Sequence, residues 1–135
     1  MAGGPMIFEA PTGAEIFVGR DAAQNDAMTR SAGARDVWMH AEGPGAHVIL
    51  KASAGGPDPR DLRFAADLAV YWSKARGTRT KVTVAGARDV VTQRDGSAAV
   101  LTVLTSPKTL VGRPLAAAPV RAGALSCTTA AAALA

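Results

Sequence analysis

The sequence is poor in cysteine and in aromatic residues, and it has no long apolar run. Cys127 is the only cysteine among 135 residues, so no internal disulfide can form, which is typical of a reducing compartment. No apolar run approaches the roughly 18 residues that a membrane-spanning helix needs. The N-terminus lacks a basic region followed by an apolar run, so we expect no secretory signal. We therefore expect one cytoplasmic domain with its own core, while a nuclear or plastid location stays open if the natural N-terminus is longer.

Acidic residues are missing from one stretch. The net charge of +4 comes from 15 basic and 11 acidic residues, and residues 1–40 hold more acids than bases. Between Leu68 and Arg88 there is no acid, but there are five bases: Lys74, Arg76, Arg79, Lys81 and Arg88. Cations at the end of a helix explain Lys74 and Arg76, and they explain Arg79 and Lys81 less well. A local positive patch of this kind indicates an anionic polymer as a partner.

Histidine is also scarce, and the pattern places both histidines together. The segments 38–41 and 46–50 are apolar and strand-like, and Gly and Pro in residues 42–45 between them predict a tight turn. The resulting β-hairpin would pair His40 with His47 and Trp38 with Ile49, because cross-strand partners share one face of a sheet. Met39 and Val48 would then point to the opposite face.

Two interpretations of these histidines remain. Asp36 shares the His40 face by strand periodicity, so Asp36, His40 and His47 could form a metal-dependent centre, although no cysteine lies nearby. The other interpretation, which we prefer, is that the histidines have a structural or a binding role. Imidazole can hydrogen-bond a phosphate or stack on a base, which keeps a nucleic-acid role open.

The remaining pattern predicts an α+β fold. We expect a poorly structured lead-in over residues 1–12, a strand over 14–19 and a short polar helix over 20–30 capped by Asp21. Asp58 and Pro59 start a long, largely buried helix that runs to Arg76 and ends at Gly77. Strands are expected over 80–84, 89–92, 98–104 and 109–111, in a mainly antiparallel or mixed sheet. The domain would span residues 13–114, and the Ala-rich tail 115–135 would be weakly ordered.

Four blocks of sequence, in order and with matching spacing, resemble the NFACT-R domain, the predicted RNA-binding module of NFACT proteins. They are Val18-Gly-Arg-Asp-Ala-Ala-Gln-Asn-Asp-Ala-Met-Thr29, Asp36-Val-Trp-Met-His-Ala41, Pro44-Gly-Ala-His-Val-Ile-Leu50 and Ala65-Ala-Asp-Leu-Ala-Val-Tyr-Trp-Ser-Lys-Ala-Arg76. The similarity covers about residues 7–114 and fades after Lys81.

The resemblance implies a binding module of the standalone type, without catalytic residues, cofactor or metal. In multidomain relatives the module ends a protein that binds split large ribosomal subunits carrying stalled nascent chains and a tRNA. The positions that match the family's motifs are taken as a binding face with its scaffold: Gly19, Arg20, Gln24, Asn25, Asp26, Trp38, His40, Gly45, His47, Ser73, Lys74 and Arg76.

This chain departs from the family pattern in its loops. The connection from Ala41 to Ala46 is a residue shorter than usual, and Ala46 stands where Ser is common. The family's late Lys-rich stretch and Pro-Gly turn are represented only by residues 92–99, which implies weaker contact with phosphates.

From the charge and the resemblance together, we expect a non-enzymatic module that binds tRNA or large-subunit rRNA. The large ribosomal subunit is a further candidate partner, and no membrane contact is expected. Lys74, Arg76, Arg79, Lys81 and Arg20 would contact phosphates, which sets register without reading sequence. His40, His47, Gln24 and Asn25 would contact sugar or base edges. Trp38 and Trp72 are assigned to the core. The alternatives are a module that binds a ribosomal protein and the metal-dependent enzyme described above.

Overall fold

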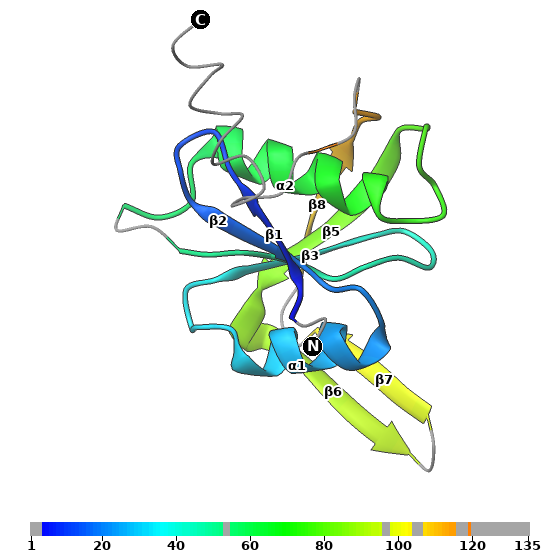
Figure 1. Ribbon diagram of the computed structural model, residues 1–135. Helices are drawn as coiled ribbons and strands as arrows, with labels where there is room; N and C mark the ends of the chain where they lie inside the picture. Colours follow the sequence, from blue (N-terminus) through cyan, green and yellow to red (C-terminus); the bar gives the residue numbers. More distant parts are fainter. Residues whose placement is uncertain (1–3, 53–54, 96–97, 104–106, 116–118, 120–135) are drawn as a thin grey trace, which may run out of the picture.

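A six-stranded antiparallel sheet with a helix on each face forms the body of the protein, and a separate two-stranded hairpin extends from it (Figure 1). The computed structural model describes residues 4–52, 55–95, 98–103, 107–115 and 119, and of residues 92–103 only the backbone. The predicted α+β class is confirmed. The elements are β1 (Met6–Glu9), β2 (Glu15–Val18), α1 (Ala22–Ser31), β3 (Val37–Ala41), β4 (Val48–Leu50), α2 (Pro59–Tyr71), β5 (Thr80–Gly86), a 3₁₀ turn (Ala87–Asp89), β6 (Val90–Asp95), β7 (Ala98–Val103) and β8 (Lys108–Gly112).

The strands of the main sheet follow the order β1-β2-β4-β3-β5-β8. In the central hairpin Trp38 pairs with Ile49 and Met39 with Val48, so the predicted register is confirmed. The connection between β3 and β4 spans residues 42–47, which is longer than the four-residue turn that we expected. Residues 42–47 are called the β3–β4 loop below.

The two faces of the sheet bury different sets of side chains. Met39, Val48 and Val82 are fully buried on the face that α2 covers. Trp38 and Ile49 point the other way, because successive strand residues alternate, and they form a second cluster with Met28 of α1. Trp38 is therefore a core residue, as predicted.

The start of α1 matches the sequence pattern. The Asp21 carboxylate accepts a hydrogen bond from the Gln24 N–H at 2.9 Å, which satisfies one of the free donors of the first turn. The helix is mostly polar and buries only Met28 and Thr29. It therefore depends on a few contacts with the sheet.

The long helix α2 starts as predicted, with Asp58 as its cap and Pro59 as its first residue. It ends at Tyr71, so the expectation that it continues to Arg76 is wrong. The Trp72 carbonyl accepts a hydrogen bond from the Ala46 N–H at 3.0 Å, and the Lys74 N–H donates to Pro44 at 3.1 Å. Contacts with the β3–β4 loop thus replace the next turn of helix. Residues 72–79 are called the α2–β5 turn below.

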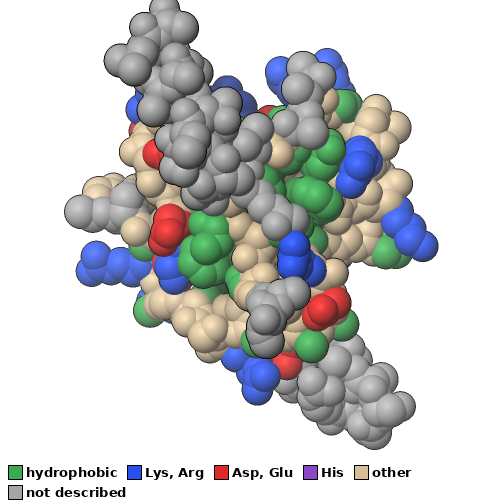
Figure 2. Space-filling model, viewed as in Figure 1, with side chains coloured by type: hydrophobic (Ala, Val, Ile, Leu, Met, Phe, Trp, Pro, Cys, Tyr) green, Lys and Arg blue, Asp and Glu red, His purple; other side chains and the backbone are tan. Residues whose placement is uncertain are grey.

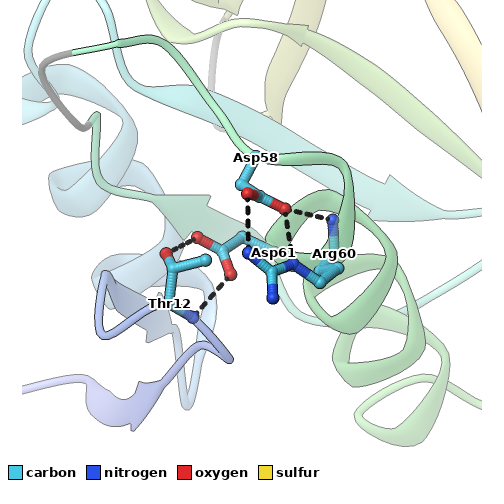
Figure 3. Close-up of polar contacts among 4 residues, drawn as sticks. All are labelled: Thr12, Asp58, Arg60 and Asp61. Atoms are coloured by element: carbon cyan, nitrogen blue, oxygen red, sulfur yellow. Dashed lines mark hydrogen bonds and ion pairs between the residues drawn. The ribbon is translucent and has the colours of Figure 1, made fainter.

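The N-terminal segment is also more ordered than expected. Residues 6–9 form the edge strand β1, paired with β2, so the interpretation of residues 1–12 as a poorly structured lead-in is wrong for this part. The turn between β1 and β2 is attached to α2 (Figure 3): the Asp61 carboxylate accepts hydrogen bonds from the Thr12 N–H, at 3.0 Å, and from the Thr12 hydroxyl. Asp61 is almost completely buried.

The later strands lie close to their predicted ranges. β5 and β8 pair with each other, with Lys81 opposite Val111, and β6 pairs with β7. The side chains of residues 92–99, where the family's basic stretch was expected, lie outside the described residues, as does nearly all of the tail 115–135. The division into a domain at 13–114 and a tail stays a prediction. Within the described residues, no helix is both long and apolar enough to cross a membrane.

Candidate nucleic-acid interface

Most of the predicted site residues lie at one end of the sheet. Arg20 follows β2, and Lys81 lies near the start of β5. His40 lies near the end of β3, and His47 is the last residue of the β3–β4 loop. The α2–β5 turn adds its three basic residues at this end, because α2 stops beside the loop (Figure 1).

Close backbone contact joins the β3–β4 loop to the α2–β5 turn. Gly45 and Ser73 form an isolated β-bridge, beside the two hydrogen bonds of Ala46 and Lys74 given above. A Cβ atom at Gly45 would lie 2.8 Å from the Cβ of Ser73, which is closer than such atoms approach. Glycine is therefore needed at this position, and the two segments form one surface.

This surface carries exposed cations. Lys74, Arg76, Arg79 and Lys81 are all exposed, and Lys and Arg side chains line the right-hand edge of Figure 2, where Figure 1 places the two segments. Lys81 points to the face opposite α2, since its neighbour Val82 is buried beneath that helix. The prediction of a local cationic surface fits this arrangement.

Arg76 is the most constrained of these cations. Its Nε donates to the Tyr71 carbonyl at 2.6 Å, and its guanidinium carbon lies 4.0 Å from the centre of the Tyr71 ring and 5.4 Å from that of Trp72. The ring faces attract the cation and hold it in place without neutralising it. The guanidinium is therefore oriented before any ligand arrives.

A cavity of about 510 Å³ lies beside these residues. Its lining includes the end of β2 and the start of α1, the β3–β4 loop and the first residue after α2: Gly19, Arg20, Ala22, Asn25, Gly45 and Trp72. Arg20 and Asn25, two of the predicted site residues, thus line the same cavity.

Gln24 and Asn25 have structural roles at this position. The Gln24 side-chain oxygen accepts a hydrogen bond from the Arg20 N–H at 2.8 Å, and that of Asn25 accepts from the His47 N–H at 3.1 Å. These bonds order the turn before α1 and attach it to the β3–β4 loop. That the two side chains also contact RNA stays a prediction.

The histidine rings lie together as the hairpin register predicted. Their centroids are 5.5 Å apart, and His40 stacks on Trp38 at 5.9 Å with an interplanar angle of 5°. His47 is buried, and its Nδ1 lies 2.9 Å from the Thr29 hydroxyl. His40 keeps part of its surface exposed. Of the two rings, His40 is the one that a nucleotide could reach without a change in the structure.

Both imidazoles favour the neutral form. Burial, and after it the adjacent His40, lower the pKa of His47 to about 4, although hydrogen bonding with the Asn25 backbone and the charge of Asp26 act in the opposite direction. Burial also lowers the pKa of His40, against hydrogen bonds with the backbone of Gly45 and Ala41. Near neutral pH the pair can donate and accept hydrogen bonds, but it adds no charge to the cationic surface.

Asp36 does not join the histidines. Its carboxylate accepts hydrogen bonds from the N–H groups of Gly33 and Ala52 and pairs with Lys51 at 2.6 Å. Burial alone would raise the pKa of Asp36, but these contacts, Lys51 foremost, hold it below its usual value. Among the described residues no group of three or more His, Cys, Asp or Glu side chains could hold a metal ion. Asp36 thus supports the start of β3, and the alternative metal centre lacks its third ligand.

Tyr71 and Trp72 were not among the predicted site residues. Trp72 was assigned to the core, and it does pack against the core, but it is only partly buried and also lines the cavity. The useful signal in the sequence was the adjacent aromatic pair shortly before Arg76, since the faces of aromatic rings attract a nearby guanidinium.

Comparison with known proteins agrees with this geometry. The family model described as the NFACT protein RNA-binding domain matches residues 5–103. The chain is 38% identical over 71 residues to the Rqc2 homolog RqcH of Bacillus subtilis, covering 51% of this chain and 12% of that protein. It is 40% identical over 65 residues to RqcH of Streptococcus pneumoniae, covering 45% of this chain and 11% of that protein. The chain thus spans about an eighth or less of these relatives.

A solved structure shares the fold. It is the C-terminal part of the fibronectin/fibrinogen-binding protein of Streptococcus suis, with a TM-score of 0.77 and 30% identity, covering 86% of this chain and 47% of that one. The family match covers most of the chain, and so does the structural match. The chain therefore belongs to the family of NFACT protein RNA-binding domains.

Proposed function

We propose that this domain binds RNA, as tRNA or large-subunit rRNA, in ribosome-associated quality control, and that it does so without catalysing a reaction. Family membership and the relatives named RqcH support this role. The observation that carries it is the joined surface of the α2–β5 turn and the β3–β4 loop, with four exposed cations on or beside it.

Each group has a distinct role in this proposal. Lys74 and Lys81 contact phosphates as point charges on flexible side chains, and Arg79 does so through its planar guanidinium. Arg76 binds from a fixed orientation. Arg20 approaches the same strand of RNA from the start of α1. His40, which is neutral, contacts a sugar hydroxyl or a base edge.

Fluorescence anisotropy with labelled tRNA tests the proposal, with a DNA duplex of similar size as the control nucleic acid. Affinity for tRNA should exceed affinity for DNA, and it should fall by orders of magnitude between about 50 and 200 mM salt, because each phosphate contact releases counterions. No binding to tRNA even at low salt would overturn the proposal.

A triple variant, K74A/R76A/K81A, locates the interface. We expect much weaker binding and a salt slope that is smaller by about two to three, close to one per lost contact. A control variant, R35A/R88A, removes two exposed cations at the other end of β3 and β5, where Val37 pairs with Gly86. Equal losses of affinity per removed charge in the two variants would show that only net charge matters.

Arg76→Lys separates charge from orientation. Lysine keeps the charge but loses the hydrogen bond to the Tyr71 carbonyl and much of the ring contact. We expect an affinity between those of the wild type and Arg76→Ala, with an unchanged salt slope. An affinity equal to that of the wild type would show that the fixed orientation has no part in binding.

A protein partner on the ribosome is the second candidate. Val111 is 53% exposed on β8, an edge strand of the sheet, and it is the exposed large hydrophobic residue of the described part of the chain. Binding to a ribosomal protein through this edge would resist moderate salt. Val111→Asp would then weaken ribosome binding, and the triple variant would not.

A further inference from the structure

We infer that the cavity beside the start of α1 accepts one unpaired nucleotide of the bound RNA, with its base against Trp72 and its phosphate near Arg20 and Arg76. The inference rests on the proposed RNA-binding function. It adds that the site selects unpaired RNA over duplex RNA.

The size and lining of the cavity suit a base. Its volume of about 510 Å³ lies within the range of about 300–1,000 Å³ that is usual for small-ligand sites. Met6, Ala46 and Trp72 supply apolar surface, while Arg20, Asp21 and Asn25 supply polar groups. An apolar surface with a few polar groups matches a flat aromatic base whose edges carry donors and acceptors.

The walls of the cavity are held in place before RNA binds. A Cβ at Gly19 would lie 1.9 Å from the Asn25 side-chain oxygen, and one at Gly45 would lie 2.8 Å from the Cβ of Ser73. Asn25 also bonds the His47 backbone across the gap between α1 and the β3–β4 loop. These close contacts fix the distance between the walls, so little conformational entropy is lost when RNA binds.

The charges near the cavity favour a phosphate. Arg20 lines it, and the guanidinium of Arg76 lies 5.4 Å from the ring of Trp72, another lining residue. Asp21 is the opposing charge, and one of its carboxylate oxygens accepts the Gln24 N–H. Two arginines against one such carboxylate leave a positive balance, as a sugar–phosphate chain passing over the cavity requires.

A base inside a duplex cannot enter a cavity of this kind, because it is stacked and paired. Proteins that bind single-stranded RNA instead stack splayed bases on aromatic side chains and on arginine planes. Trp72 and the stacked Arg76 offer both kinds of surface at one place. The geometry therefore selects single-stranded segments, loops or ends over regular helices.

Filling the cavity tests the inference. Ala22 is exposed and lines the cavity, whereas Ala23, its exposed neighbour in the first turn of α1, lies outside the lining. Ala22→Phe should occupy the space of the base, and Ala23→Phe is the matched control for changes in the helix start. Binding of both variants is measured with a short labelled oligouridine and with a fully paired RNA hairpin, after equal urea unfolding midpoints show intact folds.

We expect Ala22→Phe to weaken oligouridine binding by about fivefold to a hundredfold, the range expected for one base stack, and to leave hairpin binding unchanged. Ala23→Phe should bind both as the wild type does. Unchanged oligouridine binding in Ala22→Phe, together with a loss in the K74A/R76A/K81A variant, would overturn the nucleotide site and keep the proposed function. Failure of the wild-type domain to bind any of the RNAs would overturn both.

Photocrosslinking provides a second readout that needs no variant. An oligouridine carrying 5-iodouridine should crosslink to Trp72 or Met6, which mass spectrometry of the digested complex identifies. Crosslinks confined to residues outside the cavity lining would overturn the inference.

Discussion

The side-chain oxygen of Asn25 accepts a hydrogen bond from the backbone N–H of His47 at 3.1 Å. This contact joins α1 to the residue that precedes β4, 22 residues further along the chain. Both residues were predicted to contact RNA. The structure gives them a shared role in holding one wall of the cavity against the hairpin.

Asn25→Ala should therefore lower stability. It removes the acceptor of the His47 N–H in a partly buried position, which costs about 1–3 kcal/mol of unfolding free energy. Urea denaturation measures the effect. Arg20→Ala, an exposed neighbour, should stay within about 0.5 kcal/mol of the wild type. Equal stability of Asn25→Ala and the wild type would rule out the proposed structural role.

Gly45→Ala should separate the β3–β4 loop from the α2–β5 turn. Its Cβ would lie 2.8 Å from that of Ser73 and 3.1 Å from the Ser73 Cα, so one of the two segments has to move. We expect a loss of about 1–3 kcal/mol in stability and a weaker affinity for tRNA, measured by denaturation and by anisotropy.

Gly55→Ala is the control for this substitution. A Cβ at Gly55 would have no atom within 4 Å, and this glycine is not among those with positive φ. Gly55→Ala should leave both the stability and the affinity for tRNA unchanged. Normal tRNA binding by a destabilised Gly45→Ala variant would show that the two segments need not be joined for binding.

Stability should decrease on mild acidification because of His47. Its pKa is about 4 in the folded protein and near 6.5 in the unfolded chain, so between these values the unfolded chain binds more protons. The contribution is fully present above about pH 6.5 and is lost as the pH falls toward 4, by up to about 3 kcal/mol. Urea midpoints measured across this range test the expectation.

His47→Gln is the variant that isolates this contribution. Glutamine cannot take up a proton in this range, so its stability should vary less with pH than that of the wild type. Identical pH profiles would mean that another group causes the loss.

Asp61→Ala should destabilise the protein through the turn between β1 and β2. The variant leaves the Thr12 N–H and hydroxyl without their acceptor (Figure 3), at a cost of about 1–3 kcal/mol. Asp61→Asn keeps an acceptor and should lose less. A double-mutant cycle with Thr12→Val measures the coupling, and additive losses would show that the two residues act independently.

Local signals predicted a large part of the fold. Asp58 followed by Pro59 marked the start of α2, and the apolar segments around the Gly-Pro-Gly turn predicted the pairing of Trp38 with Ile49. These features depend on residues close in sequence, so periodicity and turn chemistry are enough to find them.

Long-range contacts account for the errors. α2 ends at Tyr71 because backbone groups of Ala46 and Pro44 bond the residues that follow it, and no property of residues 72–76 alone indicates this. β1 is four residues long, and its order depends on pairing with β2 at the edge of the sheet. Sequence patterns do not show which partner such a short segment will find.

For the site, charge was the informative signal. Exposed cations such as Lys74 and Arg79 could be identified because a run without acids is visible in the sequence. The cavity could not be predicted, since it arises where four segments that are distant in sequence meet. The polar side chain of Asn25 suggested a contact with a ligand. In the structure, the side-chain oxygen of Asn25 accepts a hydrogen bond from the His47 N–H within the protein.

The order of the strands also bears on how the chain folds. β2 pairs with β4 rather than with β3, and β5 pairs with β8 across the inserted β6–β7 hairpin. Sheet formation therefore requires closing several long loops before their contacts stabilise the fold, which slows folding. During synthesis the β1–β2 hairpin would leave the ribosome well before β4 and Asp61, which stabilise it. Until about half of the chain has emerged, its apolar residues Phe8 and Ile16 would lack their final neighbours.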